Sequence, residues 1–243
     1  MTAIATPTTI EHSNLQQFSQ QAAFYCTLAF AFFIPISPAL MNTFLFFTLI
    51  FILLSGNLKE HWKTAWNNPV AKAGILLFLL FIVGTTWSIV DFREALQGLK
   101  KYNELWYIAL IIPLFNTENR KQLGINTFLA SMSLVLLVTY SIYFGLFPQF
   151  HIPISEGHTA IISTDGGFRT HIITNILMSF STFIFAQRAI MHTGIAKVLY
   201  AIMFTASFYY ALFISTGTTG QILTIGLSTL FFIQHLRWKS AVI

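Results

Sequence analysis

Long apolar runs, separated by short polar stretches, recur along the whole chain. A helix needs about 20 apolar residues to cross the hydrocarbon core of a bilayer. Segments near this length occupy approximately residues 22–37, 39–55, 70–90, 104–116, 125–147, 171–188, 197–215 and 219–236. The pattern predicts an all-α, polytopic membrane protein with about eight transmembrane helices. Residues 1–21 are predicted as a loosely ordered polar N-terminal tail, and residues 22–243 as a transmembrane helical domain.

Prolines interrupt two of these segments. Pro35 and Pro38 lie in the sequence PISP between the first two apolar runs, where they break helix geometry. This sequence predicts either a tight hairpin or one bent segment that does not fully cross. The run 104–116 is short and contains Pro113.

The composition supports a lipid environment. Of 243 residues, 55% are hydrophobic and 9% charged, whereas soluble domains carry roughly 25% charged residues. A soluble fold of this size could not bury so much apolar surface, because much of a small protein's surface stays in water. The basic residues form no continuous face, so nucleic-acid binding is not expected. The single cysteine, Cys26, excludes an internal disulfide.

The basic residues predict the orientation, because Lys and Arg prefer cytoplasmic loops. With the N-terminus inside, the cytoplasmic loops hold Lys59, Lys63, Lys72, Arg120, Lys121, Arg188, Lys197, Arg237 and Lys239. The external loops then hold Arg93, Lys100, Lys101 and Arg169. Nine against four favours N-in/C-in.

Two external segments carry candidate binding residues. Residues 91–103 have apolar positions at helical spacing, which is typical of an amphipathic interfacial helix. Its Lys100 and Lys101 serve either as interfacial anchors or as contacts for a diphosphate-linked substrate. The loop 148–171 contains several histidines and acids, but no ligand pair at the i, i+4 spacing of a helical metal site, so no metal is predicted.

Arg169 ends that loop, in the sequence GGFRTHIITNILMSF. An arginine at a membrane boundary can present its planar fork of donors to a phosphate. The alternative is that Arg169 extends to lipid headgroups. Asn175 is expected to face the same side as His171, four residues earlier.

The stretch ISTGTTGQIL, residues 214–223, separates the last two apolar runs. Gly217 and Gly220 allow a tight turn or a close approach of backbones. The threonine hydroxyls can bond backbone groups freed by the break. The simpler alternative is a short connection between two helices.

Three stretches together resemble the N-terminal portion of the O-antigen ligase and O-antigen polymerase family of bacterial membrane proteins. They are WSIVDFREALQGLKKYNELWYIALIIPLF, GGFRTHIITNILMSF and STGTTGQILTIGLSTLFFIQHLRWK. The likeness covers most of residues 25–240. It implies a glycosyltransferase of the bacterial inner membrane, active in lipopolysaccharide biosynthesis.

Such proteins move glycan from undecaprenyl diphosphate to a lipid A–core acceptor at the periplasmic face, without metal or other cofactor. The resemblance makes Arg169 a diphosphate contact, with Lys100, Lys101, His171 and Asn175 as further substrate-binding candidates. It assigns no catalytic residue in this chain, because the family's histidine lies in a later periplasmic loop, beyond the sequence LRWKSAVI. The chain is therefore expected to match only the N-terminal part of the family fold, and to be truncated or inactive by itself.

The family also has an arginine in a GRTG sequence, where this chain has Thr218.

A function of a different class, without enzymatic activity, also stays open from the sequence. The chain is then a non-enzymatic transporter, flippase or assembly partner for lipid-linked sugars. Transporters usually have polar or broken helices at mid-membrane depth.

Overall fold

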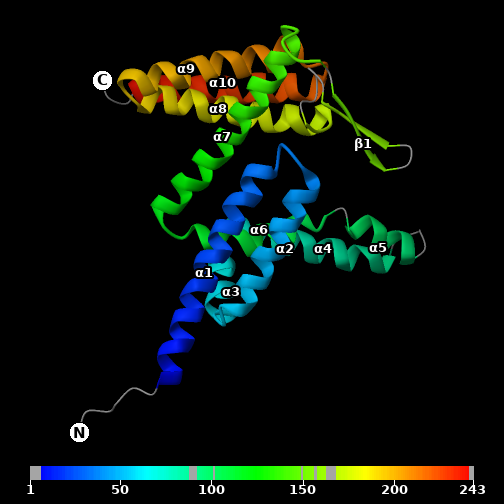
Figure 1. The fold of residues 1–243 in the computed structure, drawn as a ribbon, viewed down its shortest axis with the longest axis vertical. Coiled ribbons are helices and arrows are strands. Elements are labelled where there is room, and N and C mark those ends of the chain that lie inside the picture. Colours follow the sequence, from blue (N-terminus) through cyan, green and yellow to red (C-terminus); the bar gives the residue numbers. More distant parts are fainter. Residues whose placement is uncertain are drawn as a thin grey trace. The chain divides into compact units, whose positions relative to one another are not determined.

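A computed structural model of the chain describes residues 7–87, 92–100, 102–148, 150–155, 158–162 and 168–240. In these ranges the fold is helical apart from one antiparallel hairpin (Figure 1). The chain divides into two compact units. The first unit comprises residues 1–30 and 41–125, and the second comprises residues 31–40 and 126–243.

The helices up to residue 115 are α1 (Pro7–Phe33), α2 (Pro38–Leu54), α3 (Leu58–Asn67), α4 (Pro69–Gly84), α5 (Phe92–Lys100) and α6 (Glu104–Ile111), with 3₁₀ turns η1 (Thr85–Trp87) and η2 (Ile112–Phe115). The remaining elements are α7 (Glu118–Tyr143), β1 (Phe150–Ser155), β2 (His158–Ile162), α8 (His171–Met191), α9 (Gly194–Tyr209), the π-helix η3 (Tyr210–Ile214) and α10 (Thr218–Ser240).

The two prolines of PISP produce a turn between separate helices. α1 ends at Phe33, whose carbonyl accepts from the amides of Ile36 and Ser37 at 3.1 and 3.0 Å. Pro38 begins α2, where its fixed φ and missing amide hydrogen suit a first helical position. Two separate helices therefore flank the turn, as the hairpin alternative predicts.

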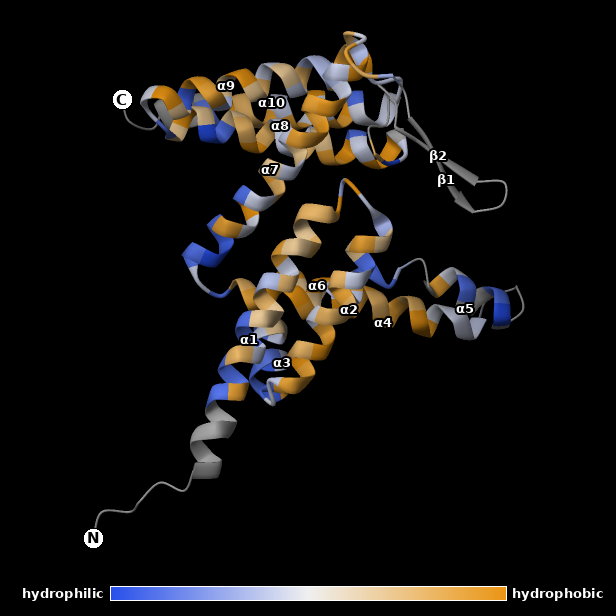
Figure 2. Cartoon of the chain, viewed as in Figure 1, coloured by the Kyte–Doolittle hydropathy of each residue, from blue (hydrophilic) through white to orange (hydrophobic). Residues whose placement is uncertain are grey.

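Three of the described helices are long and apolar enough to cross a membrane: Pro69–Trp87, Glu118–Tyr143 and Gly194–Ile214. Helices α2 and α3 qualify only together, and they are bent by 117° at their junction. Figure 2 shows α4 as hydrophobic along its length, while α3 and the first turns of α7 are hydrophilic. Three to four candidate spans thus support a membrane protein, and the count of eight stays a prediction.

Three segments differ from their simplest sequence interpretation. The part of the predicted polar tail that the structure describes, residues 7–21, is helical and continues into α1 without a break. The run 104–116 is α6 followed by η2, about 18 Å of helix at ~1.5 Å per residue, which is short for a ~30 Å core. The loop 148–171 contains the hairpin β1–β2, paired from Phe150–Ile162 to Ser155–His158. The predicted amphipathic segment 91–103 does contain a helix, α5.

Packing in the first unit depends on two apolar clusters. Ala23, Phe24, Ile52 and Leu114 form one. Ala65, Ala71, Ile75 and Ala109 form the other. The small alanines allow close approach of helices, which matters in lipid because no hydrophobic force drives helices together there.

In the second unit, α8 packs against both α9 and α10. Its buried face is rich in small polar side chains. The buried polar residues of α8 are Thr174, Asn175, Ser179, Ser181 and Thr182. This composition places hydroxyls at the contacts between helices, and α8 is not among the candidate spans named above.

Candidate functional site

The sequence predicts five substrate-binding residues, and the structure describes the side chains of two. Lys100 is the last residue of α5 and His171 the first of α8, but both side chains lie outside the described part of the structure. Lys101 lies outside it entirely. Arg169 and Asn175 both belong to the second unit.

Arg169 is half-buried immediately before α8. Its Nη1 donates to the carbonyl of Ile34, in the turn between α1 and α2, at 2.7 Å. This bond ties the Arg169 side chain to the turn between α1 and α2, while its backbone lies two residues before the first residue of α8. Thr170, the cap residue there, makes no side-chain capping bond. Arg169 thus precedes the N-terminal end of α8, and both a guanidinium and the positive end of a helix dipole favour an anion.

Asn175 has a different environment, since it lies at the contact between α8 and α10 and is only 1% exposed. Its Oδ1 and Nδ2 have no hydrogen-bond partner among the described residues. Gly220 of α10 packs directly on it. A Cβ added to Gly220 would lie 2.5 Å from the Asn175 Cβ, inside any normal contact distance. The structure thus brings the motif around Arg169 and the stretch 214–223 together through Asn175 and Gly220.

Hydroxyl groups extend this contact by one helical turn. Ser179 Oγ lies 2.8 Å from the Asn175 carbonyl, 3.1 Å from the Gly220 carbonyl and 2.7 Å from Thr224 Oγ1. A serine hydroxyl has one hydrogen, so when it donates to a carbonyl the Thr224 hydroxyl donates to it. The glycine at position 220 lets these groups meet.

The break at residues 214–223 follows the π-helix η3. The Ser215 amide donates to the Tyr210 carbonyl at 3.0 Å, the i to i+5 bond that widens the helix. Gln221 of α10 then donates through Nε2 to the Leu212 carbonyl at 3.2 Å. A polar side chain thus satisfies a carbonyl at the end of the preceding helix.

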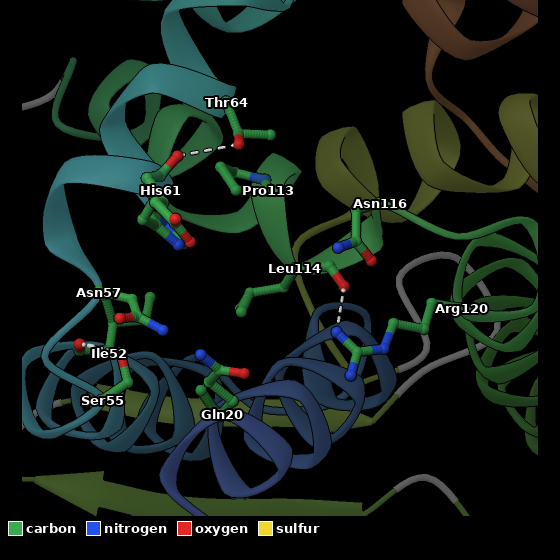
Figure 3. A pocket seen from close by; sticks show the side chains of 12 residues that line it. Gln20, Ile52, Ser55, Asn57, His61, Thr64, Pro113, Leu114, Asn116 and Arg120 are labelled. Atoms are coloured by element: carbon green, nitrogen blue, oxygen red, sulfur yellow. Dashed lines mark hydrogen bonds between the residues drawn. The ribbon is translucent and has the colours of Figure 1, made fainter. Parts of the chain in front are cut away.

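A cavity of about 200 Å³ lies in the first unit (Figure 3). Helices α1, α2, α3 and the start of α7 contribute to its walls, together with η2. The lining residues that carry charge or can titrate are Glu60, His61 and Arg120. Its uncharged polar residues are Gln20, Ser55, Asn57, Thr64 and Asn116. Figure 3 shows Gln20, Asn57, His61 and Arg120 around the same open space.

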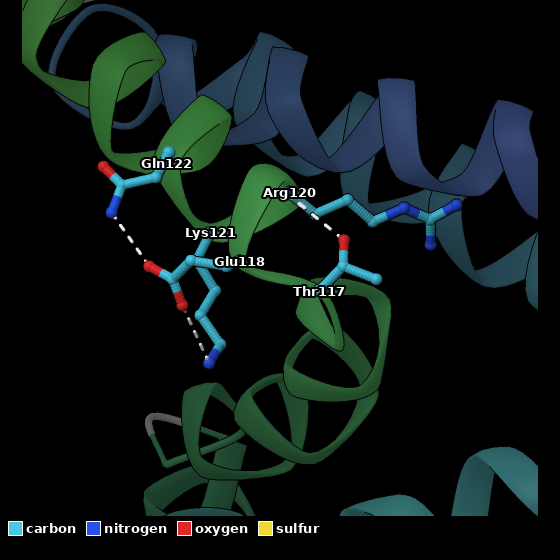
Figure 4. Close-up of polar contacts among 5 residues, drawn as sticks. All are labelled: Thr117, Glu118, Arg120, Lys121 and Gln122. Atoms are coloured by element: carbon cyan, nitrogen blue, oxygen red, sulfur yellow. Dashed lines mark hydrogen bonds and ion pairs between the residues drawn. The ribbon is translucent and has the colours of Figure 1, made fainter.

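Two contacts position Arg120. Its Nη1 donates to the carbonyl of Leu114 at 3.2 Å, and its guanidinium lies over the Phe24 ring, 4.7 Å from the centroid. Glu118, two residues earlier, is directed elsewhere. It forms a 3.5 Å ion pair with Lys121 and accepts from Gln122 at 2.9 Å (Figure 4). The first turn of α7 therefore places one charge in the cavity and another outside it.

His61 faces the cavity from α3. Its Nε2 lies 2.9 Å from the Leu110 carbonyl, and a carbonyl only accepts, so this nitrogen carries a hydrogen. Burial lowers the pKa of His61 from its usual value, and the bond to Leu110 opposes this effect in part. The neutral imidazole is therefore favoured, with Nδ1 as an acceptor.

Sequence reasoning missed the cavity because it treated residues 56–69 as a loop between spans. The sequence nevertheless contains a signal for a helix in this stretch. Leu58, Trp62, Ala65 and Trp66 repeat at intervals of three and four, which predicts an amphipathic helix. The distant partners Gln20 and Arg120 gave no local signal.

Comparisons with protein-family models, with curated proteins and with solved structures find no match for this chain.

Gly220→Ala is expected to lower the stability of the second unit. The added methyl group would overlap the Asn175 Cβ, and overpacking of this kind costs about 1–3 kcal/mol. Thermal unfolding of the detergent-solubilised protein measures the effect. Gly226→Ala on the same helix is the matched control, because a Cβ there meets nothing within 4 Å. That variant should gain up to about 1 kcal/mol from helix propensity. Equal behaviour of the two variants would contradict the close approach of α8 and α10.

The first unit is expected to lose stability as the pH falls. Because the pKa of His61 is lowered in the folded state, the unfolded chain binds more protons once the pH drops through about 6.5. The stabilisation is complete well above that pH and declines below it. Unfolding curves between pH 8 and pH 5.5, compared with those of His61→Gln, isolate this contribution. The glutamine amide can still donate to Leu110 but does not titrate. A pH dependence unchanged by the substitution would exclude His61 as its source.

Proposed function

We propose that the chain is a multi-pass protein of a bacterial inner membrane, in N-in/C-in orientation with about eight helices crossing or entering the bilayer. Its apolar helices and the uneven distribution of Lys and Arg support this proposal. In this orientation the loop 148–171 and Arg169 are periplasmic. Lys59, Lys63, Arg120 and Arg188 are then cytoplasmic.

Within this membrane setting, the proposed activity is that of an O-antigen ligase-like protein. It binds a glycan on undecaprenyl diphosphate at the periplasmic face and takes part in its transfer to lipid A–core. The observation that carries the proposal is Arg169, which bonds to the Ile34 carbonyl and lies two residues before the first residue of α8.

The chemistry gives the arginine a defined role. In glycan transfer the acceptor hydroxyl attacks the sugar carbon, and the bond from that carbon to the diphosphate oxygen breaks. Negative charge develops on the departing diphosphate, and a prepositioned cation lowers that barrier. A guanidinium also offers two parallel donors to phosphate oxygens. Lys100 and Lys101 are proposed as weaker contacts, and the base that accepts the hydroxyl proton is assigned to no residue here.

A second candidate function is transport or flipping of a lipid-linked sugar without chemistry. One observation favours it. The buried contact between α8 and α10 contains an amide, Asn175, without a hydrogen-bond partner among the described residues, next to the interruption between η3 and α10. Interrupted helices with unsatisfied polar groups are typical of transporter binding sites. The variant Arg169→Ala separates the two functions. Loss of glycan transfer with intact movement of the lipid-linked glycan favours the ligase over the transporter.

The orientation is expected to show in labelling of residue 160. In a Cys26→Ser background, Ala160→Cys should react with a membrane-impermeant maleimide added to intact spheroplasts. Lys197→Cys, on the opposite side in this topology, is the matched control and should react only after the membrane is opened. Labelling of position 160 from the cytoplasmic side alone would refute the topology and with it the role of Arg169.

Arg169→Ala is expected to abolish attachment of polymer to lipid A–core while leaving membrane abundance unchanged. Loss of a charge-assisted hydrogen bond weakens binding of undecaprenyl diphosphate about 10- to 100-fold. Electrophoresis of lipopolysaccharide and binding to the purified protein measure the two effects. Arg169→Lys keeps the charge without the fork and should retain part of the binding.

Arg188→Ala is the control for this experiment. Arg188 is also half-buried, lies at the other end of α8, and donates to Asn126 Oδ1 at 3.2 Å. It should leave the lipopolysaccharide pattern normal. A normal pattern in Arg169→Ala as well would reject the proposed role.

A further inference from the structure

The cavity of the first unit contains opposite charges that do not pair with each other. Glu60 and Arg120 both line it. Within the part of the chain that the structure describes, the ion pair present is Lys121–Glu118, and none joins Glu60 to Arg120. Glu60 is exposed and Arg120 half-buried, and both contribute to the lining without an ion pair between them. A ligand with one negative and one positive end would complement both.

The volume of the cavity matches a small polar group. A volume of about 200 Å³ corresponds to roughly seven water molecules at ~30 Å³ each. A phosphate ester that carries a short aminoalkyl arm has a similar number of heavy atoms. The apolar residues Ala23, Ile52 and Leu114 line part of the same wall and suit the carbon atoms of such an arm.

The hydrogen-bonding groups favour an ammonium with N–H donors. Glu60 accepts through its carboxylate, and neutral His61 accepts through Nδ1, because its Nε2 donates to the Leu110 carbonyl. Arg120, steadied by Leu114 and Phe24, provides donors for phosphate oxygens. A quaternary choline has no N–H to offer these acceptors, and a glycerol head group has no cation for Glu60.

The position of α3 suits a membrane lipid as the source of the head group. α3 departs from α2 at 117°, so the two do not form one straight span. Trp62 and Trp66 stack on one another with centroids 6.5 Å apart, and each is about 40% exposed. Exposed tryptophans beside basic residues are typical of the interface of a bilayer, where head groups lie. Lys72 extends over the Trp66 ring at 5.4 Å.

We infer that this cavity binds the phosphoethanolamine head group of a membrane phospholipid, with Arg120 on the phosphate and Glu60 and His61 on the ammonium. The inference requires attachment to a membrane but not the proposed ligase activity, because all of its residues lie in the first unit and Arg169 lies in the second. The site gives the chain selectivity among the lipids of its own bilayer.

Binding of single-chain lipids to the purified full chain tests this assignment. Native mass spectrometry is used with lysophosphatidylethanolamine, lysophosphatidylcholine and lysophosphatidylglycerol of equal acyl length. The ethanolamine lipid should bind about fivefold or more tightly than the other two, in keeping with a partly solvated ion pair. Equal affinity for the three lipids would overturn the inference.

Two carboxylate variants make the test specific. Glu60→Gln should bring the preference for ethanolamine over choline to within about twofold. Glu118→Gln is the matched control, because that carboxylate pairs with Lys121 outside the cavity. It should leave the preference intact. Equal loss in both variants would also overturn the inference.

Arg120→Lys tests the phosphate end of the same site. This variant keeps the charge and should weaken all three lipids together, leaving the ethanolamine preference in place. An unchanged affinity for all three would show that Arg120 does not contact phosphate and would overturn that part of the assignment.

Competition with soluble phosphoethanolamine separates the two possible sources of the ligand, a membrane lipid and the free ester. Failure to displace the lipid at equal concentration supports the lipid, and full displacement refutes it in favour of the free ester. Neither result depends on glycan transfer, so failure here leaves the role of Arg169 intact.

Discussion

Hydrogen bonds from serine and threonine hydroxyls to backbone carbonyls and to each other hold the buried faces of these helices together. Lipid provides no hydrophobic force between helices, so association depends on close packing and on polar contacts. In the first unit the hydroxyls of Thr27 and Thr48 meet at 3.4 Å, while Thr27 also donates to the Ala23 carbonyl. In the second unit Ser131 donates to the Phe32 carbonyl, and Ser179 meets Thr224. The helices can come this close because the side chains at these contacts are small.

The same constraint explains how each unit holds an arginine of its candidate site. Arg120 donates to the Leu114 carbonyl, next to a 3₁₀ turn, and Arg169 donates to the Ile34 carbonyl in a proline turn. At such breaks the carbonyls lack a helical partner, so they are free to accept from a side chain. A guanidinium carries five donors in one plane, so a bond to a backbone carbonyl helps to fix that plane. The turns thus determine where a membrane protein with few charges can place a cation.

Much of this arrangement follows from local sequence. The apolar runs predicted the helices, PISP predicted the α1–α2 turn, and Pro113 coincides with the change from α6 to η2. The apolar runs predict about eight spans, and three to four candidates among the described helices have the length and composition of a span. α8, with its buried polar face, is not among these candidates. The contact between Asn175 and Gly220 was beyond prediction, since the sequence indicates that position 220 permits a close approach but not which residue approaches. The cavity was missed for a related reason. Its walls come from four helices and a 3₁₀ turn, and its histidine lies in the connection between two of the apolar runs.

The π-helix η3 has a consequence for chain length. Its i to i+5 bond accommodates one residue more than an α-helix of the same rise. Each residue of an α-helix turns the chain by about 100°, so an insertion elsewhere in α9 would rotate every later side chain to another face. The wide turn confines that rotation to the last residues before the extended Ser215, so the rest of α9 keeps its packing against α8. Homologues that differ by one residue in this region should therefore place the gap within residues 210–214, and those without the extra residue should continue α9 as a regular helix.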